Sequence, residues 1–338
     1  MRELTVKDAI NEGLRQAMEA DDRVFMMGED IAGGAGRDEQ GGLDAWGGPF
    51  GVTQGLATRF GRERVRDTTI AEAGFFGAAV GAAMTGMRPI VELMYVDFVG
   101  VCYDQLINQA AKMRYMFGGK QRVPMVVRTV VGAGFRAGAE HSQALYPLYT
   151  HIPGLKTVAP TTPADHKALL LAAIQDDDPV IFFEHKRLYM TKGPVPEEAT
   201  PLPLGKAAVV RTGRHVTVVA VQRMVNFSLE AAAALEAEGI EAEVIDPRTY
   251  SPLDEETILA SVAKTGHLVI VDESYPRCGL AADISSIVAE KGFDYLKGPV
   301  RKVTPPHTSV PFSPPMEDFY LPSPQKIADA VRGLLGAR

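Results

Sequence analysis

The carboxyl group of Glu72 is the first side chain in this sequence that is suited to proton chemistry. It opens a run of small and apolar residues at 68–86, and no Lys or Arg stands beside it. If this run is a buried helix, desolvation raises the pKa of the carboxyl group and makes it a usable proton donor. A second role stays open, because a carboxylate in the first helical turn also meets free N–H groups and the positive end of the helix dipole.

Three glycines follow Glu72 at helical spacing, namely Gly74, Gly77 and Gly81. Each glycine inside a helix costs about 1 kcal/mol relative to alanine. We therefore expect another backbone or a flat ligand to come close to this helix.

A second candidate for proton transfer is His141, in the segment "AGAEHSQALYPLY". It is expected in a loop that follows the end of a strand, where α/β proteins bind their ligands. Histidine can give or take a proton near neutral pH. The alternative is a surface histidine bonded to Glu140 or Ser142. No H-x-x-x-H or H-E-x-x-H pattern is present, so a zinc site is not indicated.

Two glycine motifs resemble a dinucleotide-binding fingerprint. "GAGRDE" at 34–39 has Glu39 in place of the last glycine, whereas "GAGFRA" at 132–137 matches G-x-G-x-x-A after a strand. The fingerprint also needs a helix at once and an acid at a strand end about 20 residues on. Here Pro147 interrupts the helix and the next strand ends in Ala159 and Pro160. Glycines that serve the loop conformation are therefore favoured over a nicotinamide site.

The elements that must hold these residues alternate along the first half of the chain. Strands are expected at residues 23–30, 88–94, 123–131, 156–160 and 179–184, and helices near 5–18, 72–86, 103–117 and 163–175. Such alternation predicts an α/β fold with a mostly parallel sheet covered on both faces.

A second alternating series follows a proline-rich segment. Strands are expected at residues 215–221, 241–247 and 267–273, and helices near 229–238, 254–264 and 325–335. The prolines 194, 196, 201 and 203 mark a linker. We predict two α/β domains, 1–190 and 206–338, joined by a linker at 191–205.

Composition excludes several classes of protein. The 338 residues carry a net charge of −7, which argues against a nucleic-acid partner. No apolar run reaches the length of about 18 residues that a membrane span needs, and the N-terminus lacks the apolar core of a signal peptide. Two distant cysteines, Cys102 and Cys278, give no disulfide framework. A cytoplasmic protein without a membrane partner is expected.

Five motifs, "TIAEAGF", "ELMYVDF", "NQAAKMRYMFGG", "AEHSQ" and "THIPGLK", appear in order and at characteristic spacing. Through them the chain resembles, over its whole length, the beta subunit of thiamine diphosphate-dependent 2-oxo acid dehydrogenases, the first component of pyruvate, branched-chain and acetoin dehydrogenase complexes. The resemblance implies a transketolase-like, thiamine diphosphate-binding fold, with a pyrimidine-binding domain followed by a transketolase C-terminal-like domain.

The resemblance also implies roles for individual residues. Glu72 matches the glutamate that bonds N1′ of the cofactor's aminopyrimidine and favours its imino tautomer, which takes the proton from the thiazolium ring. His141 matches the histidine that assists proton transfer during reductive acylation of the lipoyl group. Ile70, Met94 and Phe98 match positions that pack around the pyrimidine. A potassium site of some members maps onto Met125, Ala173, Ile174, Asp176 and Asp178, where Asp178 replaces an expected asparagine.

One family motif is missing from the chain. The diphosphate and Mg²⁺ motif, G-D-G followed by paired asparagines, is absent from the sequence. In the family the alpha subunit supplies it, so the resemblance implies half an active site, an α2β2 heterotetramer and docking on a lipoyl-bearing acyltransferase core.

The resemblance leaves more than one activity open. "DAWGG", "GVTQGL", "FEHKRLY" and "PHTSVPFS" look most like acetoin dehydrogenase beta subunits. Pyruvate and branched-chain 2-oxo acid dehydrogenases are the alternatives. A stand-alone NAD-dependent oxidoreductase and a non-catalytic assembly subunit are more distant ones.

Overall fold

The alternation of helices and strands predicted from the sequence is present in the folded chain. The computed structural model describes residues 1–34 and 46–336, so the motif at 34–39 lies almost wholly outside the described residues. The strands are β1 (Arg2–Thr5), β2 (Val24–Gly28), β3 (Val65–Asp67), β4 (Arg88–Leu93), β5 (Val126–Val131), β6 (Lys156–Val158), β7 (Val180–His185), β8 (Lys192–Val195), β9 (Ala208–Arg211), β10 (Val216–Ala220), β11 (Ala242–Asp246), β12 (Thr249–Ser251), β13 (Leu268–Val271) and β14 (Arg301–Val303).

The helices alternate with these strands in both halves of the chain. They are α1 (Val6–Ala20), α2 (Leu56–Phe60), α3 (Glu72–Met84), α4 (Val99–Asp104), α5 (Ala111–Met116), α6 (Pro147–Thr150), α7 (Pro163–Gln175), α8 (Arg223–Glu236), α9 (Glu255–Thr265), α10 (Leu280–Lys291), α11 (Pro314–Tyr320) and α12 (Pro324–Leu335), with 3₁₀ turns η2 (Val96–Phe98) and η4 (Phe293–Tyr295) and a π-helical turn η3 (Gln105–Ala110). Among the described residues, none of these helices has the length and hydropathy needed to cross a bilayer.

Two compact units divide the chain. The first consists of Met1–Val130 and Tyr149–Leu204, and the second of Val131–Leu148 and Gly205–Arg338. The predicted domains assign the loop at 131–148 to the first domain. It belongs instead to the second unit, because its backbone amides bond to Glu273 and Glu317 there.

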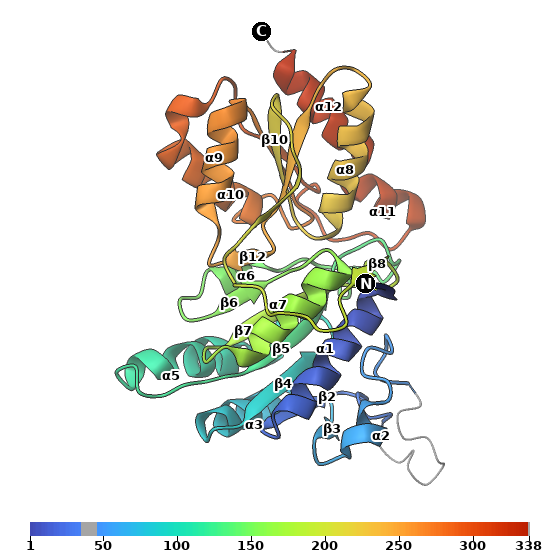
Figure 1. Ribbon diagram of the computed structural model, residues 1–338, viewed down its shortest axis with the longest axis vertical. Helices are drawn as coiled ribbons and strands as arrows, with labels where there is room; N and C mark the ends of the chain where they lie inside the picture. The colour runs from blue at the N-terminus through green and yellow to red at the C-terminus, as the bar shows by residue number, and fades with distance from the viewer. Residues whose placement is uncertain (35–45, 337–338) are drawn as a thin grey trace. The chain divides into compact units, whose positions relative to one another are not determined.

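The sheet of the first unit orders its strands β6-β7-β5-β4-β2-β3. The pairs β2–β3, β2–β4, β4–β5 and β6–β7 are parallel. Met26 and Ile90 pack in one core with α1 and α7, which lie side by side in Figure 1. Their neighbours Phe25 and Val91 point the other way and are also buried, so both faces of the sheet are covered.

Local capping explains where the two helices on this face begin. The Thr5 hydroxyl accepts the N–H of Asp8 at the start of α1, and Thr162 accepts that of Asp165 at the start of α7. Proline occupies the first helical position of α7, where no N–H is required. These signals lie within a few residues of each helix, which is why the sequence predicts them well.

The predicted linker is partly a strand. Lys192–Val195 forms β8, which pairs antiparallel with β1, and Pro194 lies opposite Glu3. A two-stranded ribbon leaves one side of each strand free of ladder bonds, and proline is tolerated at such an edge. The segment predicted as a linker therefore contains a strand at its start.

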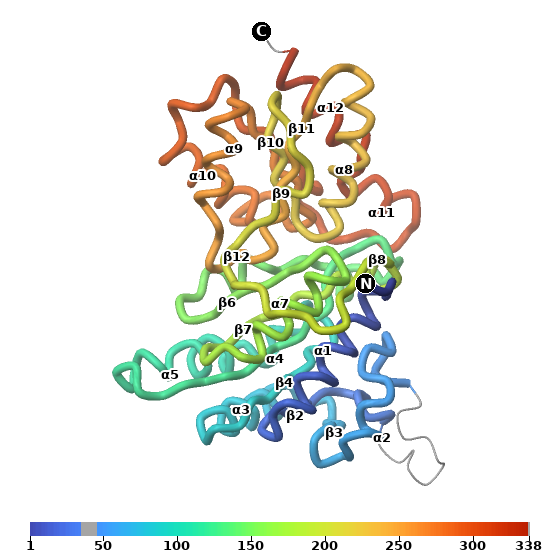
Figure 2. Tube along the Cα trace, in the orientation of Figure 1, coloured from blue at the N-terminus to red at the C-terminus, as the bar shows by residue number. Residues whose placement is uncertain are grey.

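The second unit has a sheet of order β14-β13-β10-β11-β9. Strand β10 is parallel to β11 and β13, and β9 runs antiparallel to β11. Figure 2 shows α8 beside α12 on one side of β10 and α9 beside α10 on the other. The neighbouring residues Val218 and Val219 are both buried, as expected for a strand covered on both faces.

Candidate active site

The carboxyl ends of β2 and β4 form a topological switch point. The chain leaves β2 towards β3 on one side and leaves β4 towards β5 on the other. Open α/β sheets bind ligands in the crevice outside the carboxyl ends of two such strands. Glu29 follows β2 directly, Met94 follows β4 directly, and Glu72 follows β3 within five residues. The fold thus brings three segments with candidate residues to one edge.

Glu72 is the first residue of α3 and its exposed fraction is only 6%. The predicted burial is therefore confirmed. Within residues 1–34 and 46–336, no Lys or Arg forms an ion pair with Glu72. No backbone N–H of these residues donates to its carboxylate either, so the capping alternative keeps only the helix dipole.

The partner of Glu72 is another acid. Glu29 forms a hydrogen bond with Glu72, and its pKa is raised to about 7 by burial first and then by the charges of Glu72, Asp30 and Glu92. Sequence reasoning missed Glu29, although an acid directly after a buried strand could have identified it.

The residues expected around a pyrimidine ring lie at the same edge. Ile70, in the loop before α3, is 84% exposed. Met94 and Phe98 are half-buried, and the Phe98 ring packs edge-on against Tyr95 at 5.7 Å. Close to these segments, the buried Thr68 hydroxyl and Gln105 carbonyl oxygen lack hydrogen-bond partners among the described residues. Apolar walls with orphaned polar atoms fit an aromatic heterocycle that carries hydrogen-bonding groups.

The glycines of α3 do not serve packing within the described chain. A Cβ at Gly74 or Gly81 would meet no described atom within 4 Å, and one at Gly77 would meet only Gln105 at 3.7 Å. The predicted close approach is therefore not made by the described residues. An approach by another molecule stays a prediction.

His141 lies in the loop at 131–148 and is half-buried. The loop is closed by the N–H of Gly132, which donates to the carbonyl of Gln143 at 3.0 Å. The Ser142 hydroxyl is buried and has no partner among the described residues, so it does not hold His141. Glu72 belongs to the first unit and His141 to the second.

The "GAGFRA" motif binds carboxylates of the protein itself. The N–H of Ala133 donates to Glu273, and the N–H groups of Gly134 and Arg136 donate to Glu317. No helix opens after the motif, since the next one, α6, begins at Pro147. Because these N–H groups already donate to carboxylates, they are not available to a pyrophosphate. The structure therefore does not support the nicotinamide alternative.

A buried ion network holds the central strands together. Arg128 on β5 donates to Glu184 on β7 at 2.6 and 2.8 Å and to Glu92 on β4 at 2.7 Å. Burial alone would lower the pKa of Arg128, but the charges of Glu184 and Glu92 outweigh it and raise that pKa. The network therefore ties β4, one of the two strands at the switch point, to β5 and β7.

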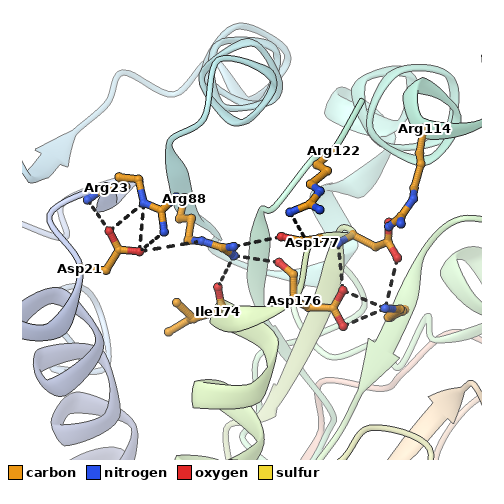
Figure 3. A network of polar contacts seen from close by, with 10 residues as sticks. Asp21, Arg23, Arg88, Arg114, Arg122, Ile174, Asp176 and Asp177 are labelled. Carbon is orange, nitrogen blue, oxygen red and sulfur yellow. Dashed lines mark hydrogen bonds and ion pairs between the residues drawn. The ribbon is translucent and has the colours of Figure 1, made fainter. Parts of the chain in front are cut away.

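The residues expected to bind potassium surround fixed cations instead. Figure 3 shows the Arg88 guanidinium pointing at the C-terminal end of α7, at Ile174, and at the residues that follow the helix. Its Nη1 donates to the carbonyl oxygens of Ile174 and Asp176, both at 2.9 Å. The Lys156 ammonium binds the Asp176 carboxylate at 2.7 Å and Asp178 at 3.2 Å. Asp178 also pairs with Arg114.

The remaining oxygens of that set are also hydrogen-bonded. The Met125 carbonyl accepts the N–H of Val180, and the Ala173 carbonyl accepts that of Asp176. A potassium ion here would face the charges of Arg88 and Lys156 at close range. The residues therefore do not fit a further cation in this arrangement, and no step is derived from one. A potassium site stays a prediction.

Comparison with known proteins agrees with this architecture. The family model "Transketolase, pyrimidine binding domain" matches residues 2–192, and "Transketolase, C-terminal domain" matches residues 205–327. A solved structure titled "Split gene transketolase, inactive beta4 tetramer" has a TM-score of 0.76 and 22% identity and covers 98% of each chain. At that identity the likeness shows the fold.

Curated relatives are similar over nearly the full chain. The beta subunit of acetoin:2,6-dichlorophenolindophenol oxidoreductase from Bacillus subtilis is 58% identical over 99% of this chain and 98% of its own length. The same subunit from Cupriavidus necator is 58% identical over 98% and 97%. The pyruvate dehydrogenase E1 component subunit beta of Rickettsia felis is 44% identical over 98% of both chains. The chain therefore belongs to the family of transketolase-like dehydrogenase beta subunits that includes the acetoin and pyruvate enzymes.

Proposed function

We propose that this chain is the beta subunit of a thiamine diphosphate-dependent oxidoreductase that cleaves acetoin and passes the acetyl group to lipoamide. The observation that carries the proposal is the buried Glu72, held at the switch point by another acid and free of any ion pair in the described residues. The choice of acetoin rests on 58% identity to acetoin enzymes against 44% to a pyruvate enzyme.

The residues at the switch point have separate tasks in this proposal. Thiamine diphosphate, when bound, supplies an acidic ring carbon that attacks the substrate carbonyl. Glu72 would hold a proton toward a ring nitrogen of the aminopyrimidine, and Glu29, whose pKa is about 7, would keep a proton within reach. Ile70, Met94 and Phe98 would flank the ring.

His141 has a later task, namely proton transfer as the acyl group moves to the lipoyl sulfur. The imidazole is half-buried on a tethered loop. The role rests on the family resemblance and on the placement of His141 in a loop closed at its base.

The partners follow from the missing motif. The diphosphate and Mg²⁺ would be held by an alpha subunit in an α2β2 heterotetramer, and a lipoyl-bearing acyltransferase core would receive the product. Relatives named as beta subunits support an alpha partner. A cytoplasmic location stays a prediction.

The test is a reconstitution. The chain is mixed with the alpha subunit, thiamine diphosphate and Mg²⁺, and dye reduction is measured with acetoin, pyruvate and branched-chain 2-oxo acids in turn. Turnover of acetoin alone supports the proposal. Turnover of pyruvate or a branched-chain 2-oxo acid would mean that this acid, and not acetoin, is the substrate. Absence of activity with all of them contradicts it, and activity of the isolated chain contradicts the half-site.

A further inference from the structure

The carboxylate of Glu317 is fully buried, with an exposed fraction of 0%. It lies in α11, 176 residues after His141 in the sequence. A buried carboxylate must be compensated by donors. Its donors are the N–H of Gly134 at 2.8 Å, the N–H of Arg136 at 3.2 Å and the guanidinium of Arg136. Helix α11 therefore binds the backbone of the loop directly.

The backbone that Glu317 binds, at Gly134 and Arg136, has an unusual conformation. Gly134 has a φ of +88° and Arg136 a φ of +58°, both in the left-handed region. Glycine takes this region freely, whereas arginine does so at a free-energy cost. Such a residue persists only where its surroundings hold it. At Arg136, the Glu317 oxygens hold both the backbone N–H and the side chain.

The other side of the loop is held separately. The N–H of Gly132 donates to the carbonyl of Gln143, and the Tyr275 hydroxyl donates to the Gln143 side chain at 3.1 Å. His141 lies between Arg136 and Gln143. The position of the imidazole therefore depends on one anchor before it and one after it.

Packing around α11 supports the same anchor. Ala133 forms a buried cluster with Val310, Tyr320 and Leu321. Val310 precedes Glu317 in the sequence, and Tyr320 and Leu321 follow it. A Cβ at Gly138 would lie 3.6 Å from the Phe312 ring. The loop and this segment are in contact on both sides of the carboxylate.

We propose that Glu317 is a positioning residue for His141, which it serves by fixing the left-handed turn at Gly134–Arg136. The proposal rests on the proposed role of His141 in proton transfer to the lipoyl acceptor. Glu317 itself touches neither substrate nor cofactor.

The first experiment measures the loop without reference to activity. Hydrogen–deuterium exchange of peptides covering residues 132–143 is compared between the parent chain and Glu317→Gln. Glu317→Gln should speed exchange of the Gly134 and Arg136 amides by about tenfold or more, because both lose a charged acceptor. The matched control is Asp318→Asn, on the same helix and bonded to the same Arg136 at 2.7 Å, but to no loop amide. It should leave exchange unchanged.

The second experiment separates positioning from general damage. In the assembly with the alpha subunit, Glu317→Gln should lower kcat with a lipoyl acceptor by about 10- to 100-fold, as misplacement of a reacting group does. The rate with an artificial dye, which bypasses acyl transfer to lipoamide, should stay near that of the parent. His141→Ala should lower kcat with the lipoyl acceptor at least as strongly. Where Glu317→Gln fails to fold, Glu317→Asp keeps the charge with a shorter reach and should give an intermediate effect.

The outcomes are distinguishable. Unchanged exchange in Glu317→Gln, an equal effect of Asp318→Asn, or an equal loss with both acceptors overturns the positioning role. If His141→Ala leaves kcat with the lipoyl acceptor unchanged while exchange in Glu317→Gln is faster, the proposed role of His141 fails, and with it positioning for catalysis, whereas the anchoring of the loop stands.

Discussion

The carboxyl group of Glu29, directly after β2, is hydrogen-bonded to that of Glu72, the first residue of α3, and the pKa of Glu29 is raised to about 7. Neither residue predicts the other from sequence, because 42 residues separate them. The pairing places a carboxyl group whose pKa is about 7 beside Glu72 at the switch point. Four predictions follow from this arrangement and from the ion pairs around it.

Replacement of Glu72 should abolish catalysis with little effect on folding. Glu72→Gln keeps the size of the side chain but cannot donate a carboxyl proton, so dye reduction by the assembled enzyme should fall by about 100-fold or more. The matched control is Glu63→Gln, which removes an exposed carboxylate from the same unit. Full activity of Glu72→Gln would refute the proton role, provided that thermal unfolding shows both variants folded.

Glu29 should make stability depend on pH. Its pKa in the folded state lies above the ordinary value of 4.5, so the folded chain keeps a proton that the unfolded chain loses between about pH 4.5 and pH 7. The stability that this gives is complete below pH 4.5 and is lost as pH rises through about 7. Glu29→Gln should therefore flatten the fall in Tm between pH 5 and pH 8, whereas Glu63→Gln should not. Parallel Tm profiles of the parent chain and Glu29→Gln would contradict the raised pKa.

Arg128 should be essential for the stability of the first unit. Arg128→Leu leaves Glu184 and Glu92 buried without their cation and should lower the free energy of unfolding by about 3–5 kcal/mol. The control is Arg15→Leu, which breaks a solvent-exposed pair with Glu19 and should cost less than about 1 kcal/mol. Urea unfolding of the two variants measures both. A similar loss in each would show that the network is worth no more than a surface pair.

The loop at 174–178 should not need potassium, because Arg88 and Lys156 already provide its positive charge. Replacing KCl by NaCl at equal ionic strength should leave the Tm unchanged. Lys156→Met should cost about 1–3 kcal/mol, the value of hydrogen bonds to charged groups. Lys112→Met, which removes one bond to the Pro153 carbonyl, is the control and should cost less. A rise in the Tm of the parent chain that is specific to K⁺ would restore the potassium site.

Local signals allowed much of the fold to be predicted. The helix at 163–175 has the predicted bounds because Thr162 and Pro163 define its start within two residues. By contrast, β8 was missed because its stability comes from β1, at the other end of the unit. The role of Glu317 in holding the "GAGFRA" loop was missed for a similar reason, because Glu317 follows the motif by some 180 residues in the sequence. Glu72 and His141 could be selected from sequence, whereas their supports, Glu29 and Glu317, depend on tertiary contacts.

The loop at 131–148 also limits how this protein can be divided. It is encoded between two stretches of the first unit, yet its amides satisfy Glu273 and Glu317 of the second. A fragment that starts at Gly205 would contain both carboxylates and none of their loop donors. The parts of the sequence before and after Leu204 therefore cannot be exchanged independently. A chimera joined near Leu204 must take the loop at 131–148 and helix α11 from the same parent.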